Sequence, residues 1–234
     1  MHRCLPVGAL ALLGVCLLGL SGCTSSPPTR FYVLPSLISA ETATPAAPRD
    51  LTLGVGPVTL PPYLDRLQIV TRASNTRLLL GEFDQWAASL QDIVTRTLAE
   101  NLTLLIPTDR VLRHPWSRMT EPDYQVTVEV LQFDAGPSGE VVLAARWRIL
   151  SANEKELVVR QARFTAAAGR QDYEATVLAM GRTLEGLSQD MATALLTIVQ
   201  PAPRSEHDAP ESLPAVARQR PLHQRPRKAN APSR

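Results

Sequence analysis

The side chains that most often act as bases, nucleophiles or metal ligands are sparse in this chain of 234 residues. Histidine occurs four times, and only His114 lies outside the two terminal segments. His114 stands between Arg113 and Pro115, so we expect an exposed loop imidazole; a general base would need a nucleophile and an orienting group. No Cys and His residues have zinc-site spacing. The sequence therefore favours a protein with no catalytic centre, no metal and no cofactor.

Carboxylates and glycines give equally little support for catalysis. No spacing fixes two carboxylates at a catalytic separation, so we expect solvated charges and helix caps. The candidates are Asp65, Glu82, Asp84 and Asp134. Gly54 and Gly56 suggest a dinucleotide-binding loop, but the third glycine is missing and Pro57 stands where a helix should begin. We therefore exclude that motif.

Cys23 has the most specific context for covalent modification. An uncharged apolar run over residues 5–20 precedes it, and this run is shorter than the roughly 20 residues that span a bilayer. It fits the apolar region of a secretory signal peptide. The following LSGC resembles the bacterial lipobox, in which the cysteine thiol takes a diacylglyceryl group. We predict a signal peptide over residues 1–22, with diacylglycerol and an N-acyl chain on Cys23; an uncleaved anchor or a plain signal peptide is the alternative.

The cysteines and the residue after Cys23 indicate a compartment. Cys4 and Cys16 fall in the predicted signal peptide, so no thiol remains for a disulfide. In bacterial lipoproteins, Asp after the acylated cysteine commonly signals retention in the inner membrane, and here the residue is Thr24. By that resemblance we expect lipid anchoring on the periplasmic face of the outer membrane.

Hydropathy patterns predict an α/β fold, a mixed β-sheet with two long amphipathic helices packed on it. The helices are expected over residues 82–105 and 172–199, with Asp172 as N-cap and Met180 and Met191 in the core. Alternating or apolar runs predict strands over residues 31–34, 51–58, 68–72, 77–80, 110–112, 124–133, 141–149 and 157–166. The last three are expected to pair as antiparallel neighbours.

We divide the chain into four parts. Residues 1–22 are the signal peptide, 23–50 the acylated cysteine and flexible tether with one short strand, 51–200 the α/β domain and 201–234 a tail. Seven prolines, and seven Arg or Lys against three acidic residues, make the tail Pro-rich and basic, a composition typical of disorder. The tail could contact anionic surfaces or be solvated. The net charge of +2 does not favour a nucleic-acid partner.

Residues 60–66 combine two prolines, two apolar side chains and one charge of each sign. Such a segment is typical of a shaped docking surface. The alternative is a structural crossover in which Tyr63 and Leu64 cap the core. Trp86, expected on the first turns of the helix just beyond, could border the same surface. The candidate partner-binding residues are Pro61, Tyr63, Leu64, Asp65, Arg66 and Trp86.

Residues 23–200 resemble the family of ABC-type transport auxiliary lipoproteins, which includes the paraquat-inducible protein C lipoproteins. Leu67 stands where the family pattern has a proline, and the tail has no counterpart in that pattern. The resemblance rests on LSGC at 20–23, FYVL at 31–34, LGVGPVTLPPYLDRLQIVTR at 53–72, LGEFDQWAASLQDIVTRTLAENL at 80–102 and YQVTVEVLQFDAGPSGEVVLAARWRI at 124–149.

The resemblance implies a non-enzymatic outer-membrane lipoprotein. Such a protein works with an MCE-domain (mammalian cell entry) protein and inner-membrane transport components, and moves phospholipid or other hydrophobic molecules between the membranes. The resemblance also implies an α/β sandwich related to the amino-terminal domain of TolB, and is compatible with a homo-oligomeric ring. The alternative function is a structural envelope lipoprotein that contacts peptidoglycan or another anionic surface without a transport role.

Overall fold

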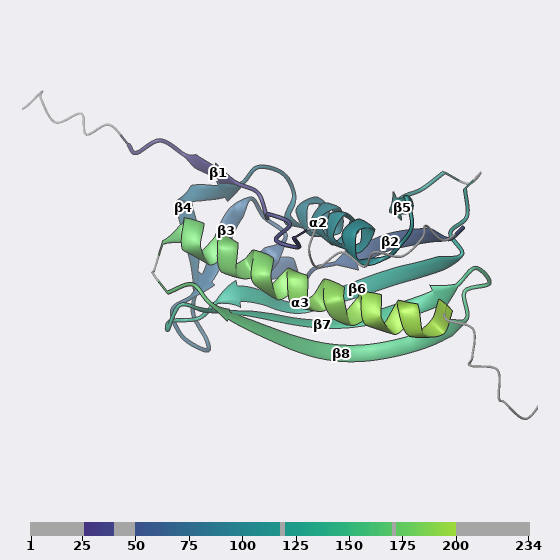
Figure 1. Ribbon diagram of the computed structural model, residues 1–234. Helices are drawn as coiled ribbons and strands as arrows, with labels where there is room; N and C mark the ends of the chain where they lie inside the picture. The colour runs from purple at the N-terminus through teal and green to yellow at the C-terminus, as the bar shows by residue number, and fades with distance from the viewer. Residues whose placement is uncertain (1–25, 40–49, 118–119, 170–171, 200–234) are drawn as a thin grey trace, which may run out of the picture. The chain divides into compact units, whose positions relative to one another are not determined.

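We describe the computed structural model over residues 26–39, 50–117, 120–169 and 172–199 (Figure 1). The predicted signal peptide, Cys23 and the basic tail lie outside the described residues. Within the described ranges the elements are β1 Arg30–Tyr32, β2 Thr52–Thr59, the short 3-10 helix η1 Pro62–Leu64, β3 Gln68–Arg72, β4 Leu78–Trp86, α2 Leu90–Leu105, β5 Arg110–Arg113, β6 Tyr124–Ala135, β7 Glu140–Ser151, β8 Glu156–Ala167 and α3 Tyr173–Val199.

Strand β6 is the central strand of a mixed sheet and pairs with three other strands. One side of β6 pairs with β7 in antiparallel register, and β7 pairs with β8 in the same way, as the sequence predicted. The other side of β6 pairs in parallel with β2 and, at Ala135, with β3. Beyond β2, strand β5 pairs with β2 in parallel, and these two strands form one branch of the sheet. Beyond β3, strand β4 pairs with β3 in antiparallel register and β1 pairs with β4 in parallel, and these three strands form the other branch. Two branches therefore leave the same side of β6.

Helices α2 and α3 contact each other and cover one face of the sheet (Figure 1). On β7 the inward side chains are buried, including Trp147 at 0% exposure, whereas Arg146 and Arg148 on the opposite face are exposed. The same alternation on β6 buries Val128 and exposes Glu129. The hydrophobic face of the sheet is thus buried by the two amphipathic helices, which confirms the predicted α/β architecture.

The predicted α3 stripe forms much of the core. Met180 and Met191 are 1% and 0% exposed, as expected for core residues. The main-chain N–H of Ala175 donates to Oδ1 of Asp172 at 2.6 Å, so Asp172 caps the helix as predicted. None of the helices in the described part of the chain has the length and apolar character needed to cross a bilayer.

The helix predicted over residues 82–105 begins later than expected. Residues 82–86 belong to β4, and the helix starts after Ser89, whose Oγ accepts a hydrogen bond from the N–H of Asp92 at 3.1 Å. The Ser89 hydroxyl in turn donates to the Asp92 carboxylate at 2.7 Å. Phe83 and Trp86 have helical spacing, but Trp86 reaches the core from a strand that pairs with β1.

Replacing Ser89 by alanine should lower the free energy of unfolding by about 1 kcal/mol, because the N–H of Asp92 loses its acceptor. Urea unfolding followed by circular dichroism measures this, with exposed Gln91→Ala as a control that leaves the cap intact. If the helix ran through residue 89, alanine would be the better helix former. A neutral or stabilising Ser89→Ala would therefore contradict the cap.

Candidate functional site

The segment between β2 and β3, residues 60–67, is the candidate docking surface and is called the 60–67 loop below. It is internally hydrogen-bonded: the N–H of Leu64 donates to the carbonyl of Pro61 at 2.9 Å, and the N–H of Arg66 donates to the carbonyl of Leu64 at 2.8 Å. Pro62 opens the 3-10 helix η1, where its missing N–H costs no hydrogen bond. The loop is therefore a defined turn.

The predicted site residues divide into buried and exposed groups. Leu64 and Trp86 are each 2% exposed and belong to the core. Asp65 and Arg66 are exposed, and Pro61 and Tyr63 are half-buried. The crossover alternative thus describes Leu64 and also Tyr63, which packs against the core, whereas Asp65 and Arg66 remain available to a partner.

Trp86 is placed differently from the expectation that it borders the docking surface on a helix. Its indole lies in the core, and it comes from strand β4. Its main-chain N–H donates to the carbonyl of Leu67 at 2.7 Å. Trp86 therefore holds the end of the 60–67 loop through its backbone and gives almost no side-chain surface to it.

A buried carboxylate anchors the middle of the 60–67 loop. The hydroxyl of Tyr63 donates to Oδ2 of Asp134 at 2.9 Å, and Nε of Arg72 donates to Oδ1 at 2.7 Å. Gln132 adds a third hydrogen bond, from its Nε2 to Oδ1 at 2.8 Å. The Asp134 side chain is 0% exposed. Burying this charge is tolerable because a cation and two further donors satisfy both oxygens.

The Tyr63 phenol is a hydrogen-bond donor at neutral pH. Burial raises the pKa of Tyr63 to about 12, and the hydrogen bond to Asp134 acts in the same direction. The Arg72 guanidinium lies 5.6 Å from the centre of the Tyr63 ring, and its Nη2 donates to the phenol oxygen at 3.3 Å. We refer to Tyr63, Arg72, Gln132 and Asp134 as the Asp134 cluster.

A second buried carboxylate fixes the edge strand β1 to β4. Arg30 donates from Nε and Nη2 to the two oxygens of Asp84, at 2.8 and 2.9 Å, and the Tyr32 hydroxyl donates to Oδ1 at 2.8 Å. Asp84 is 4% exposed. Burial raises the pKa of Asp84, but the hydrogen bonds from Arg30 and Tyr32 outweigh burial and hold this pKa below its usual value.

The expectation that the carboxylates are solvated charges or caps is therefore wrong for Asp84 and Asp134. Both are buried ion-pair acceptors inside the sheet, whereas Asp65 and Glu82 are exposed as expected. The arginines that pair with Asp84 and Asp134 lie 54 and 62 residues away from them in sequence. No local pattern connects such distant residues, so only the strand pairing shows the two clusters.

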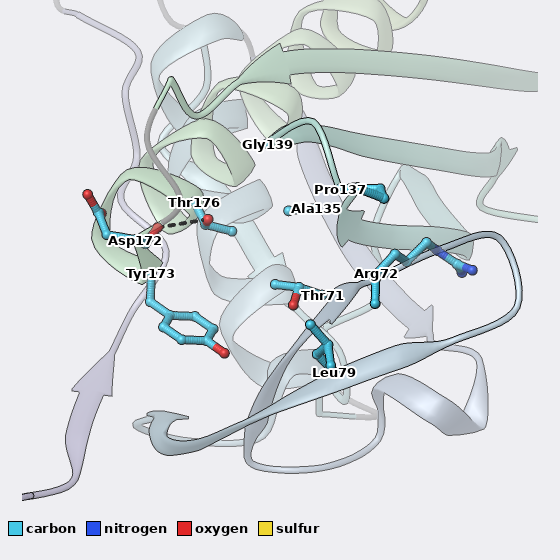
Figure 2. Close-up of a pocket in the computed structure, with 11 residues that line it drawn as sticks. Thr71, Arg72, Leu79, Ala135, Pro137, Gly139, Asp172, Tyr173 and Thr176 are labelled. Atoms are coloured by element: carbon cyan, nitrogen blue, oxygen red, sulfur yellow. Dashed lines mark hydrogen bonds between the residues drawn. The ribbon is translucent and has the colours of Figure 1, made fainter.

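An open pocket of about 330 Å³ lies near the Asp134 cluster, between β3, β4, the turn after β6 and the start of α3 (Figure 2). Its walls include Thr71, Leu79, Pro137 and Tyr173. Figure 2 shows the Arg72 side chain running away from the start of α3; its Nε donates to Asp134.

The described residues also place the histidine and the glycines considered in the sequence. No group of three His, Cys, Asp or Glu within the described ranges could hold a metal ion. His114 is exposed and contacts the edge of Trp116, with ring centroids 5.3 Å apart. Gly54 lies in strand β2, where a Cβ would come within 2.9 Å of the Trp116 ring. This glycine serves packing, as expected if residues 54–56 form no dinucleotide loop.

Replacing Tyr63 by phenylalanine should lower the free energy of unfolding by about 1 to 2 kcal/mol at pH 7, because Asp134 loses one of its donors. Urea unfolding measures this. Tyr124→Phe, at a half-buried tyrosine of β6, is the matched control and should have a smaller effect.

The effect of Tyr63→Phe should also depend on pH. The folded pKa of Tyr63, about 12, exceeds the ordinary phenol value of 10.0, so its stabilisation is complete below about pH 10. The stabilisation is lost as the pH rises through about 12. The difference in unfolding free energy between wild type and variant should therefore shrink from pH 10 upward; a constant difference, or none at pH 7, would contradict this role.

Comparisons with known proteins agree with the fold. Intermembrane transport lipoprotein PqiC of Escherichia coli (strain K12) is 24% identical over 166 residues, covering 71% of this chain and 86% of that protein. The protein of the same name from Shigella flexneri matches with the same values. A crystal structure of a Xanthomonas campestris protein has a TM-score of 0.60 at 14% identity, covering 74% of this chain and 100% of that chain.

A second solved structure, of an uncharacterized protein, also has a TM-score of 0.60, at 18% identity, covering 72% of this chain and 99% of that chain. At these identities the two structures show the fold alone; the likeness to the TolB domain stays a prediction. The sequence profile described as ABC-type transport auxiliary lipoprotein component matches residues 32–192. Because this match spans more than half of the chain and includes the 60–67 loop, the chain belongs to the family of ABC-type transport auxiliary lipoprotein components.

Proposed function

We propose that this chain is an outer-membrane-anchored periplasmic lipoprotein that serves an MCE/ABC-type intermembrane lipid transport system as a docking adaptor. The family gives an auxiliary role in transport and is not a family of enzymes. The likeness to proteins named intermembrane transport lipoprotein PqiC supports a role between two membranes. Acylation of Cys23, followed by Thr24, would supply the outer-membrane anchor.

The observation that carries the docking role is the fixed display of two opposite charges. Asp65 and Arg66 are exposed next to each other on the 60–67 loop, and neither takes part in an ion pair within the described residues. The loop that carries them is fixed in its middle by the hydrogen bond from Tyr63 to Asp134 and at its end by the backbone of Trp86. The backbone that carries both residues is therefore fixed, and their charged side chains are free for a partner.

Rigidity matters because ordering a flexible loop on binding costs free energy. A loop held by the Asp134 cluster avoids most of that cost. The partly apolar surface around the charges includes Leu67, which is 49% exposed. A surface of this kind suits a protein partner, and we assign it to the MCE-domain protein or to an inner-membrane transport component.

In this proposal the domain lies at the outer-membrane end of the transport path. Assembly of several copies into a ring there stays a prediction from the resemblance. The alternative role, a structural lipoprotein on peptidoglycan or another anionic surface, is favoured by the basic composition of residues 201–234, which lie beyond the family match. Recovery of the MCE-domain protein distinguishes the two roles.

Reversal of the Arg66 charge should weaken docking. In the full acylated chain, Arg66→Glu should reduce recovery of the MCE-domain protein from solubilised envelopes by about tenfold, which corresponds to about 1.4 kcal/mol. Arg163→Glu, an equal charge reversal at an exposed position of β8, should leave recovery unchanged. Circular dichroism checks that both variants fold.

The alternatives make different predictions for this pull-down. Equal recovery by wild type, Arg66→Glu and Arg163→Glu would show that the 60–67 loop is not the docking surface. Absence of any MCE-domain protein from the wild-type sample, with peptidoglycan recovered in its place, would support the structural role.

A further inference from the structure

Strand β1 and the residue that follows it carry the two most exposed large apolar side chains of the described residues. Phe31 is 65% exposed and Val33 is 54% exposed. Side chains alternate along an extended segment, and Arg30 and Tyr32 turn to the buried Asp84 carboxylate. Phe31 and Val33 consequently project together from the other side of the segment.

The residues that face these two side chains from β4 are uncharged, and cations stand beside them along the chain: the Arg30 side chain before Phe31 is 64% exposed, and Arg96 donates to the carbonyl of Leu34, after Val33, at 3.4 Å. Phe31 lies opposite Gln85 in the parallel pairing of β1 with β4. The carbonyl of Tyr32 accepts a hydrogen bond from the N–H of Ala87 at 2.9 Å, and Ala87 is exposed. Strand β1 also ends its branch of the sheet, since β4 is its pairing partner within the described residues (Figure 1). We call Phe31, Val33 and Ala87 the β1 patch.

The length of chain between Cys23 and β1 limits how far this patch can move from the lipid anchor. Phe31 comes eight positions after Cys23, and a chain of that length spans at most about 29 Å at full extension. Helix α3, with 27 residues, is about 40 Å long. An anchor on Cys23 therefore holds this end of the domain closer to the membrane than the length of its own main helix.

The ion pair between Arg30 and Asp84 makes this restriction effective. Two hydrogen bonds from one guanidinium, together with the Tyr32 hydroxyl, hold the start of β1 on β4. The tether from Cys23 consequently ends at Arg30, and Phe31 is held on the sheet and does not move with the tether. An anchored chain would thus present the β1 patch repeatedly to the same lipid surface, at a high effective concentration.

We propose that the β1 patch lies against the lipid bilayer that carries the acylated Cys23, as a second apolar contact that orients the domain. The proposal rests on the acylation of Cys23 in the proposed function. A bilayer surface fits the patch because the patch is apolar and uncharged, and aromatic side chains are favoured at the membrane–water interface. The contact would turn one anchor point into a defined orientation of the sheet.

Site-directed fluorescence in the full acylated chain tests this contact. Cys4 and Cys16 lie in the predicted signal peptide and Cys23 would be blocked by acylation, so Phe31→Cys or Val33→Cys supplies the sole free thiol. Each is labelled with an environment-sensitive fluorophore and reconstituted in phosphatidylethanolamine and phosphatidylglycerol vesicles that contain a lipid-bound quencher. The matched control is Val159→Cys, at a residue 52% exposed on β8.

The proposal predicts a blue shift and several-fold stronger quenching at positions 31 and 33 than at position 159. Equal quenching at all three positions, in protein whose intact mass includes the acyl chains and which stays with the vesicles, would overturn the membrane contact and leave the proposed function intact. A shift that occurs only after the MCE-domain protein is added would overturn it in favour of a protein partner. An intact mass without acyl chains would overturn the anchor and this inference together.

Discussion

A single buried carboxylate, Asp134, determines how the 60–67 loop is held. Its two oxygens accept three hydrogen bonds, from the loop, from β3 and from its own strand. A charge at 0% exposure is costly unless its partners stay in place. Any movement of Tyr63 or Arg72 would remove one of the donors to that charge, so the cluster favours one arrangement of the loop. The proposed docking function depends on this restriction.

The sheet explains why the restriction acts where it does. Asp134 lies near the end of β6, next to Ala135, which pairs with Thr71 of β3. The chain leaves the β2 branch through the 60–67 loop and enters the β3 branch there. The Asp134 cluster thus connects β6 both to β3 and to the loop that leads from β2 into β3. The second buried carboxylate, Asp84, plays a similar role at the edge of the sheet, where it holds β1.

Much of the fold could be predicted from sequence because its signals are local. The alternation in β6 and β7 and the apolar stripe of α3 gave the correct elements, and Asp172 was recognised as a cap. The predicted start of α2 was wrong because β4 is irregular. Its register with β3 shifts between Gln68 and Val70, which breaks the alternation and leaves Phe83 and Trp86 at helical spacing.

The candidate site was only partly accessible to the same reasoning. The prolines and charges identified the 60–67 loop, and the structure exposes Asp65 and Arg66 as the sequence suggested. What the sequence could not show is that Tyr63 points inward to Asp134, because the two residues are 71 positions apart. Pairs of this kind are created by strand order, for which the sequence has no local signal. The docking role itself stays a proposal.

Hydrogen–deuterium exchange over the 60–67 loop tests the central claim most directly, by comparing wild type with Asp134→Asn. The account predicts slow exchange at the amides of Leu64 and Arg66 in wild type and clearly faster exchange in the variant, while β7 stays protected in both. Unchanged exchange in the loop of a variant whose β7 is still protected would contradict the claim that Asp134 holds the loop.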